Sequence, residues 1–197
     1  MTYWAHETAI VDAPATIGAG TKIWHFCHVM AGARLGVGVV LGQNVFVGAA
    51  AVVGDHCRVQ NNVSLYDGVE LEAEVFVGPS AVFTNVRTPR ATVSRRHALA
   101  TTRVGRGATI GANETVFAGF VIGAHAFVAA GALVSRDVAP HVLVAGVPAR
   151  ATGWACVCGE ILPKPRAGRL ACGACATKYR LVGVGARARL SVTGQPK

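Results

Sequence analysis

The sequence predicts an all-β protein whose main part is a parallel β-helix, and three observations support this prediction. A large apolar residue stands at every sixth position over residues 11–83 and again over residues 104–134. The residue four places after each of the first twelve of these anchors is small or β-branched, and nine anchors are followed directly by glycine. A period of six fits neither an α-helix nor a simple strand, whereas it is the repeat of chains that wind short strands around a triangular prism. The anchors are Val11, Ile17, Ile23, Val29, Leu35, Leu41, Val47, Val53, Val59, Leu65, Leu71, Val77, Phe83, Val104, Ile110, Val116, Ile122, Val128 and Val134.

The β-helix domain is placed at residues 1–153, with residues 1–10 as a mild cap that leads into the repeat. With three hexads per coil, residues 11–83 form about four coils. Residues 84–103 break the phase and are expected to leave the prism as an excursion loop over the surface. Two further coils then reach about Val138.

Two smaller segments follow the prism. Residues 154–182 contain four cysteines and predict a small zinc-ribbon-like knob, whereas residues 183–197 carry no pattern and predict a disordered tail. Cys156, Cys158, Cys172 and Cys175 form two pairs that suit tetrahedral Zn²⁺, although the first pair is Cys-x-Cys. Free thiols and disulfides are the alternatives. Cys27 and Cys57 obey the repeat and are expected to be small buried residues.

Composition excludes some functions and favours others. Residues 35–54 carry no charge, but they hold five glycines and stay in register with the repeat, so no membrane span is expected. No signal peptide opens the chain, which makes the cytoplasm the expected location. The net charge of +9 resides mainly in the excursion loop and the C-terminal segment. Nucleic-acid binding is not favoured, because the basic C-terminal segment has few aromatic residues for base stacking.

Several segments resemble the left-handed β-helix acetyltransferases that act on nucleotide-linked amino sugars. They are Ile23-Trp24-His25-Phe26-Cys27-His28, Leu41-Gly42-Gln43-Asn44-Val45-Phe46-Val47-Gly48, Gln60-Asn61-Asn62-Val63-Ser64, Phe83-Thr84-Asn85 and Gly146-Val147-Pro148-Ala149-Arg150. The chain is most similar to the UDP-2-acetamido-3-amino-2,3-dideoxyglucuronate N-acetyltransferases of surface-polysaccharide (lipopolysaccharide) synthesis. The resemblance implies a left-handed coil, acetyl-CoA as donor, and a homotrimer with active sites between subunits. It also implies that Asn85 lies beside the acetyl carbonyl.

The repeat also predicts which side chains share a face. A coil of eighteen residues aligns His25, Gln43 and Asn61 in one column, with Asn44 and Asn62 beside them. The same spacing puts Tyr66 and Asp67 beneath Thr84 and Asn85. These polar groups suit a sugar with many hydroxyls, although Asn61 and Asn62 could instead form a ladder that satisfies backbone at the prism corners.

The remaining candidates concern proton transfer and anion binding. His25 and His28 are candidate bases, although the departing thiolate could take the proton without a protein base. Arg87 and Arg90 of the excursion loop are expected to bind phosphate or uronate. For the donor, Ala130, Gly131 and Pro148 are placed along the pantetheine arm, and Arg136 and Arg150 near the CoA phosphates.

Two residues break the inward pattern, and other functions stay open. Glu114 occupies a position that is otherwise small, so a local backbone adjustment is expected there, with a catalytic role as the alternative. Phe120 occupies another position that is otherwise small, which indicates looser packing after the interruption of the repeat. The rival acceptor is a dTDP-linked 3-amino-3,6-dideoxyhexose. Alternatives of another class are a non-enzymatic β-helix scaffold and a prism-type carbonic anhydrase, although His25, His28 and His56 lack the spacing for three converging zinc ligands.

Overall fold

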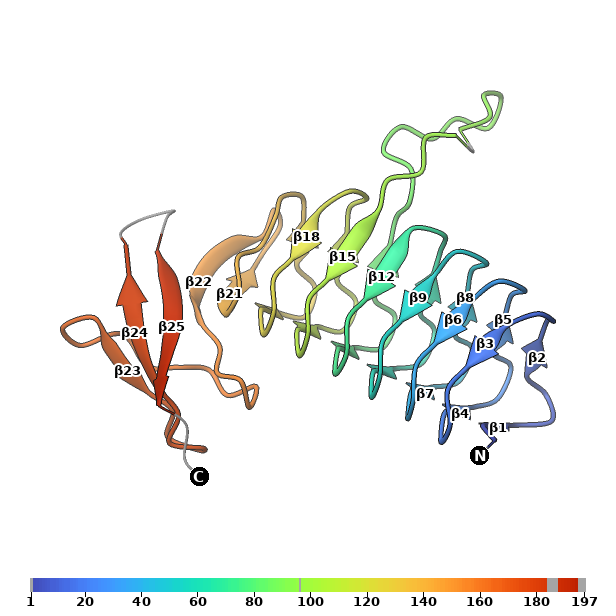
Figure 1. Cartoon of the computed structure of the whole chain (residues 1–197). Coiled ribbons are helices and arrows are strands. Elements are labelled where there is room, and N and C mark those ends of the chain that lie inside the picture. Colours follow the sequence, from blue (N-terminus) through green and yellow to red (C-terminus); the bar gives the residue numbers. More distant parts are fainter. Residues whose placement is uncertain (1, 96, 184–187, 195–197) are drawn as a thin grey trace.

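The computed structural model describes residues 2–95, 97–183 and 188–194, and these residues form strands and turns without a helix. Accordingly, this part of the chain contains no helix that is long and apolar enough to cross a bilayer. Figure 1 shows a regular column of coils, one loop that projects from its side, and a separate small sheet at the C-terminal end.

Three sheets form the walls of the column, and the strands of each coil visit the three sheets in turn. The first sheet contains β1 (Trp4–Ala5), β4 (Lys22–Ile23), β7 (Val40–Leu41), β10 (Arg58–Val59), β13 (Phe76–Val77), β16 (Thr109–Ile110), β19 (Phe127–Val128), β21 (Val142–Ala145) and β22 (Arg150–Trp154). The second contains β2 (Ile10–Val11), β5 (His28–Val29), β8 (Phe46–Val47), β11 (Ser64–Leu65), β14 (Val82–Phe83), β17 (Thr115–Val116) and β20 (Leu133–Val134). The third contains β3 (Thr16–Ile17), β6 (Arg34–Leu35), β9 (Val52–Val53), β12 (Val69–Leu71), β15 (Thr102–Val104) and β18 (Val121–Ile122).

The strands pair in parallel with the strand one coil further on, which confirms the predicted β-helix. Lys22 pairs with Val40, and Val40 pairs with Arg58, so partners lie eighteen positions apart. Stacked coils are therefore separated by the usual strand spacing of about 4.8 Å. Gly54 shows why glycine follows an anchor, since a Cβ there would lie 2.6 Å from the backbone N of Ala73 on the next coil.

The column is longer than the sequence predicted at both ends. Trp4 already pairs with Lys22, so the first residues form part of a coil rather than a cap. At the other end Leu143 pairs with Phe127, and β22 then turns back antiparallel to β21. The repeat is weak at these ends because a terminal coil has a neighbour on one side only.

The excursion loop leaves after β14 and returns before β15, as predicted. Glu70 pairs with Arg103, 33 positions later, so the column continues in register once the loop is excluded. In Figure 1 this loop is the green segment that projects away from the coils.

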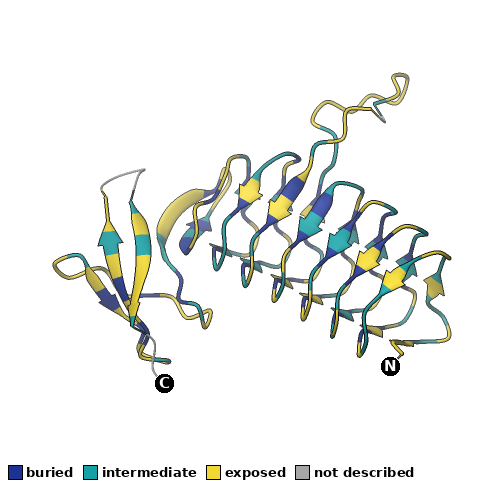
Figure 2. Cartoon of the chain, in the orientation of Figure 1, coloured by how far each residue is buried: buried dark blue, intermediate teal, exposed yellow. Residues whose placement is uncertain are grey.

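The anchors fill the interior of the column. Ile23, Leu41 and Ile110 are among the side chains with no exposed surface, and Figure 2 shows the exposed residues on the outer faces of the coils. Each such side chain contributes about 1.5–3 kcal/mol through burial. Cys27 and Cys57 are also buried, as predicted. Their Sγ atoms donate to the carbonyl oxygens of Gly42 and Glu72 at 2.9 Å.

The C-terminal sheet, here called the ribbon together with its cysteine-bearing loops (residues 155–183 and 188–194), is antiparallel. It consists of β23 (Arg169–Ala171), β24 (Lys178–Val182) and β25 (Arg189–Gly194). The prediction of a disordered tail is wrong for β25, because this strand pairs with β24 and Leu190 packs against the ribbon core. Residues 184–187 and 195–197 of that tail lie outside the described residues.

Glu114 points into the column instead of escaping from it. Its side chain is fully buried, and neither carboxylate oxygen has a hydrogen-bond partner among the described residues. The backbone stays in the ladder, since Val82 N–H donates to the Glu114 carbonyl at 2.9 Å, so the expected backbone adjustment is wrong. At this level the neighbouring coils present Ala81 and Ala132, which have small side chains and are both buried. Burial raises the pKa of Glu114 to about 8.

This pKa predicts that alkaline conditions weaken the fold through Glu114. Between an unfolded pKa of 4.5 and a folded pKa of about 8, the unfolded carboxyl ionises while the folded one stays protonated. Stability is therefore lost as the pH rises through this window, by up to several kcal/mol at about 1.4 kcal/mol per pKa unit. Urea unfolding at pH 5.5 and 8.5 should show a growing stability advantage of Glu114→Gln over the unsubstituted chain. The exposed Glu160→Gln substitution is the control, and an equal pH dependence in all three proteins would contradict the assignment.

Candidate functional site

The predicted column of His25, Gln43 and Asn61 is present on successive coils. Asn44 N–H donates to the His25 carbonyl and Asn62 N–H to the Gln43 carbonyl, both at 2.9 Å. A cavity of about 390 Å³ lies along this column, and it is lined by Trp24, His25, Val40, Gly42, Gln43, Gln60 and Asn61. The structure therefore confirms the alignment of His25, Gln43 and Asn61 that the eighteen-residue spacing predicted.

Four of the residues predicted to bind substrate make hydrogen bonds within the scaffold. Asn61 Oδ1 accepts a hydrogen bond from Gln43 N–H at 2.9 Å, and Asp67 Oδ1 accepts one from Ala50 N–H at 2.9 Å. Asn44 Nδ2 donates to Asn62 Oδ1 at 3.1 Å, and both residues are left-handed, with φ of 60° and 62°. Asparagine tolerates this conformation better than most residues, so the ladder alternative accounts for these positions.

His25 belongs to an aromatic cluster at the N-terminal end of the column. Its ring stacks on His6 with centroids 3.5 Å apart, and it lies 6.0 Å from the ring of Trp24. Sequence reasoning missed His6, because the eighteen-residue spacing puts it level with Trp24 and not with His25.

His28 has a carboxylate partner that the sequence analysis missed. Its Nε2 lies 2.8 Å from Asp12 Oδ2, and both side chains are about two-fifths exposed. The signal was present, because β2 pairs with β5 and so brings residues 10–12 next to residues 28–30. With Nε2–H donated to Asp12, Nδ1 carries the free lone pair that a general base needs. The ring centroid of Phe46 lies 5.7 Å from that of the His28 imidazole, and the ring centroid of Tyr66 lies 5.8 Å from that of Phe46.

Asn85 lies at the base of the excursion loop. Its carbonyl accepts a hydrogen bond from Ala100 N–H at 2.9 Å, which closes the loop. A cavity of about 380 Å³, here called the loop cavity, is lined by Thr84, Val86, Arg87, Pro89, Phe117, Ala118, Phe120 and Ser135, and so flanks Asn85 on both sides in sequence. The wall of this cavity is largely apolar.

Of the two loop arginines predicted to bind phosphate, Arg87 is held against the prism. Its Nε donates to the Ala118 carbonyl at 3.1 Å, and its guanidinium lies 5.1 Å from the Phe120 ring centroid. Phe120 thus supports the loop root. Arg90 lies further out, is exposed, and bridges to Val93. Arg96, which belongs to the same arginine-rich loop, lies outside the described residues.

One chain does not bring the predicted catalytic groups together. His28 is on β5 and Asn85 follows β14, and the strands β8 and β11 lie between them. Three strand spacings correspond to about 14 Å. Within one chain, His28 and Asn85 therefore cannot act on the same atom.

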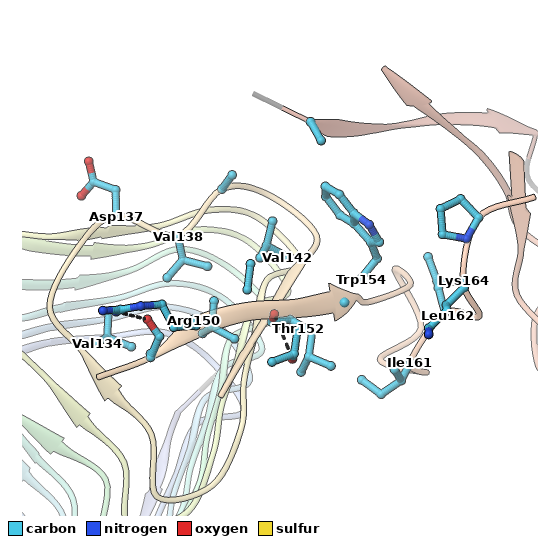
Figure 3. A pocket seen from close by; sticks show the side chains of 18 of the residues that line it. Val134, Asp137, Val138, Val142, Arg150, Thr152, Trp154, Ile161, Leu162 and Lys164 are labelled. Atoms are coloured by element: carbon cyan, nitrogen blue, oxygen red, sulfur yellow. Dashed lines mark hydrogen bonds between the residues drawn. The ribbon is translucent and has the colours of Figure 1, made fainter. Parts of the chain in front are cut away.

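Two of the predicted donor residues line a third cavity at the end of the column, here called the C-terminal cavity. It has a volume of about 660 Å³, and both Arg136 and Arg150 line it. Figure 3 shows Arg150 on the prism side and Trp154, Ile161, Leu162 and Lys164 on the ribbon side. Lys164 adds a third cation that the sequence analysis missed, because the ribbon folds back only in three dimensions.

The other predicted donor residues lie elsewhere. Ala130, Gly131 and Pro148 are not among the residues that line the C-terminal cavity. Gly131 is an exposed turn residue with φ of 69°, and its N–H donates to the Ala112 carbonyl at 2.9 Å.

The four C-terminal cysteines converge as predicted. Their Sγ atoms all lie within 4.8 Å of one another, so the cluster could hold a metal ion. No other group of three or more potential metal ligands is found among the described residues. His25, His28 and His56 accordingly do not form a three-histidine site within this chain.

Comparison with known proteins identifies the architecture. The profile described as "Hexapeptide repeat of succinyl-transferase" matches residues 28–53, 39–67 and 101–136. The chain also resembles the acetyltransferase domain of PglB from Neisseria gonorrhoeae FA1090, with 23% identity and a TM-score of 0.50 over 77% of this chain and 58% of that one. The same domain has been solved in complex with acetyl coenzyme A, with a TM-score of 0.51. The chain therefore has the left-handed β-helix fold, and its repeat matches the hexapeptide profile over residues 28–67 and 101–136.

A curated relative is similar over a shorter stretch. It is the dTDP-3-amino-3,6-dideoxy-alpha-D-galactopyranose 3-N-acetyltransferase of Aneurinibacillus thermoaerophilus, which is 47% identical over 57 residues. The match covers 29% of this chain and 30% of that protein, so the chain spans well under two thirds of the relative's length.

The Asn61 ladder predicts separable effects on stability and binding. Asn61→Ala removes the acceptor for Gln43 N–H and should lower the free energy of unfolding by about 1 kcal/mol, as for a typical hydrogen bond. Gln43→Ala leaves that bond in place and should change stability much less. Urea denaturation of the two variants measures the difference, and equal losses would contradict a scaffold role for Asn61.

Proposed function

We propose that this chain transfers the acetyl group of acetyl-CoA to the amino group of a nucleotide-linked amino sugar. The observation that carries the proposal is the position of Asn85 between Thr84 and Val86, two residues that line an apolar cavity on a β-helix. The 57-residue similarity to a sugar 3-N-acetyltransferase supports the same reaction.

We infer that the donor runs along the end of β20, where neighbouring residues line the two cavities. Ser135 lines the loop cavity, whereas its neighbours Val134 and Arg136 line the C-terminal cavity. CoA phosphates held by Arg136, Arg150 and Lys164 would let the pantetheine arm run past Ser135 toward Asn85. Guanidinium and ammonium groups are suited to this task because they donate several charge-assisted hydrogen bonds to phosphate.

The chemical step requires attack of a neutral amine on the thioester carbonyl. The C–N bond forms as the carbonyl oxygen gains charge, and the C–S bond then breaks to release CoA. Asn85 Nδ2–H would stabilise that oxygen, which is the role of an oxyanion-hole donor. The amine proton leaves either to the departing thiolate or to a base of the His28–Asp12 type.

Association of three chains would resolve the separation of His28 and Asn85. A neighbouring copy could bring its own His28 face toward the Asn85 of the first. Exposed apolar residues on the coils near Asn85 support such packing; they are Tyr66, Val82, Phe117 and Val121. The nucleotide sugar would then lie between subunits, with its polar groups near the faces that carry His28 and Gln43.

As the acceptor substrate we propose a UDP-linked 2-acetamido-3-amino uronate, and a dTDP-linked 3-amino-3,6-dideoxyhexose is the second candidate. The first fits the cations near Asn85, of which Arg90 is exposed. The second is favoured by the name of the curated relative. We place the product in surface-polysaccharide synthesis in the cytoplasm.

Thiol release from acetyl-CoA tests the reaction. The full chain is incubated with UDP- and dTDP-linked 3-amino sugars, and CoA formation should appear with at least one of them and not with the corresponding 3-hydroxy sugars. A preference of tenfold or more in kcat/KM decides between the two acceptors. Absence of release with every amine would refute the transferase and favour a scaffold.

Asn85→Ala should reduce kcat/KM by about 100-fold or more, the usual effect of losing one oxyanion donor. The fold should persist, because the hydrogen bond that closes the loop uses the backbone carbonyl of Asn85. Thr88→Ala, in the exposed part of the same loop, is the matched control and should retain activity. Unchanged kcat/KM in Asn85→Ala would remove this residue from the mechanism.

A further inference from the structure

The four sulfurs of the ribbon have the spacing of a tetrahedral metal site. Cys156 Sγ lies 3.4 Å from Cys175 Sγ, and Cys158 Sγ lies 3.6 Å from Cys172 Sγ. A zinc–sulfur bond of about 2.3 Å places two sulfurs of a tetrahedron roughly 3.8 Å apart. The observed contacts are close to this value and longer than the roughly 2.05 Å of a disulfide.

Hydrogen bonds around the sulfurs match those of metal-bound thiolates. The hydroxyl of Tyr179 lies 3.0 Å from Cys156 Sγ, and Val157 N–H donates to the same hydroxyl oxygen at 2.9 Å. The phenol proton is therefore free to point at the sulfur. Cys175 N–H also faces Cys172 Sγ at 3.5 Å. Such outer donors orient metal ligands and stabilise their charge.

The ribbon also has too small a core to fold well without a cross-link. Its apolar core cluster consists of five buried residues, Cys156, Leu162, Leu170, Cys172 and Tyr179, and two of these five are cysteines of the metal-ligand group. Small domains of this size usually depend on a disulfide or a metal, and binding a metal then supplies free energy of folding.

We propose that Cys156, Cys158, Cys172 and Cys175 bind one structural Zn²⁺ ion, and that this ion fixes the ribbon wall of the C-terminal cavity. Four protein thiolates complete the tetrahedron and leave no open position for catalysis. Soft thiolate ligands in a tetrahedral arrangement favour zinc over magnesium or calcium.

The link from the ion to the cavity runs through the segment between the two cysteine pairs. Ile161, Leu162 and Lys164 line the C-terminal cavity, and Leu162 is at the same time part of the ribbon core. Leu162 N–H also donates to the Trp154 carbonyl at 2.8 Å. Since the ion would hold both ends of this segment, removal of the ion would make the ribbon side of the C-terminal cavity mobile. The consequence for acetyl-CoA binding rests on the proposed function.

Contacts with His141 also attach the ribbon to the last coils. Ala155 N–H donates to the His141 carbonyl at 2.7 Å, and Tyr179 lies edge-on to the His141 ring at 5.5 Å. His141 in turn stacks on His125 at 5.2 Å. Tyr179 therefore contacts both the cysteine cluster and the column.

Metal analysis of the full chain purified under reducing conditions tests the site itself. We expect one zinc per chain, and loss of that zinc in Cys158→Ser and Cys172→Ser. Tyr179→Phe keeps the packing but removes the hydroxyl, and should weaken zinc binding 10- to 100-fold in competition with a chromophoric chelator. Tyr3→Phe, at the far end of the column, should not change zinc affinity. Iron in place of zinc, a metal-free protein with four titratable thiols, or two disulfides would each overturn the assignment.

The wall is tested on the same protein with and without a chelator. Trypsin should cleave after Arg166 and Arg169 at least tenfold faster once zinc is removed, while the prism stays intact. The Kd for CoA should rise at least tenfold, and added zinc should restore both properties. Unchanged proteolysis after complete zinc loss would overturn the role of the ion in the wall. A different outcome separates the two proposals. If zinc removal speeds proteolysis but the zinc-loaded protein does not bind CoA, the proposed function is contradicted and the proposed zinc site is supported.

Discussion

The constant advance of eighteen residues per coil is the constraint on which the rest of the structure depends. It keeps Lys22, Val40 and Arg58 in one parallel ladder and stacks the anchors into a continuous core. Glycine at positions such as Gly54 permits the close approach of successive coils, because any Cβ would meet the next backbone. The excursion loop is tolerated since β15 resumes the register that β12 left.

A scaffold of this kind fixes functional groups by their coil number, so distances cannot adjust as they do in a flexible pocket. Asn85 and His28 are held about three strand spacings apart, and no side-chain rotation closes a gap of about 14 Å. The same rigidity places Ser135 and Arg136 in two adjoining cavities. The geometry therefore favours an extended substrate or donor that spans several coils, and a site completed by another chain.

The ribbon is stabilised by a different principle from the column. The column buries a long row of aliphatic side chains, whereas the ribbon buries few and brings four sulfurs within 4.8 Å of one another. Because the ribbon supplies Leu162 and Lys164 to the C-terminal cavity, the two principles meet at the place where the acyl donor is proposed to bind.

The sequence by itself determined the repeat, the coil length, the column of His25, Gln43 and Asn61, the loop and the cysteine cluster, since each follows from a fixed spacing along the chain. Tertiary structure decided what spacing does not encode. Lys164 of the ribbon and Arg150 of β22 line one cavity, and β25 forms because β24 offers it an edge. Glu114 points into the column although neither carboxylate oxygen has a hydrogen-bond partner among the described residues, and no spacing along the chain sets the direction of that side chain.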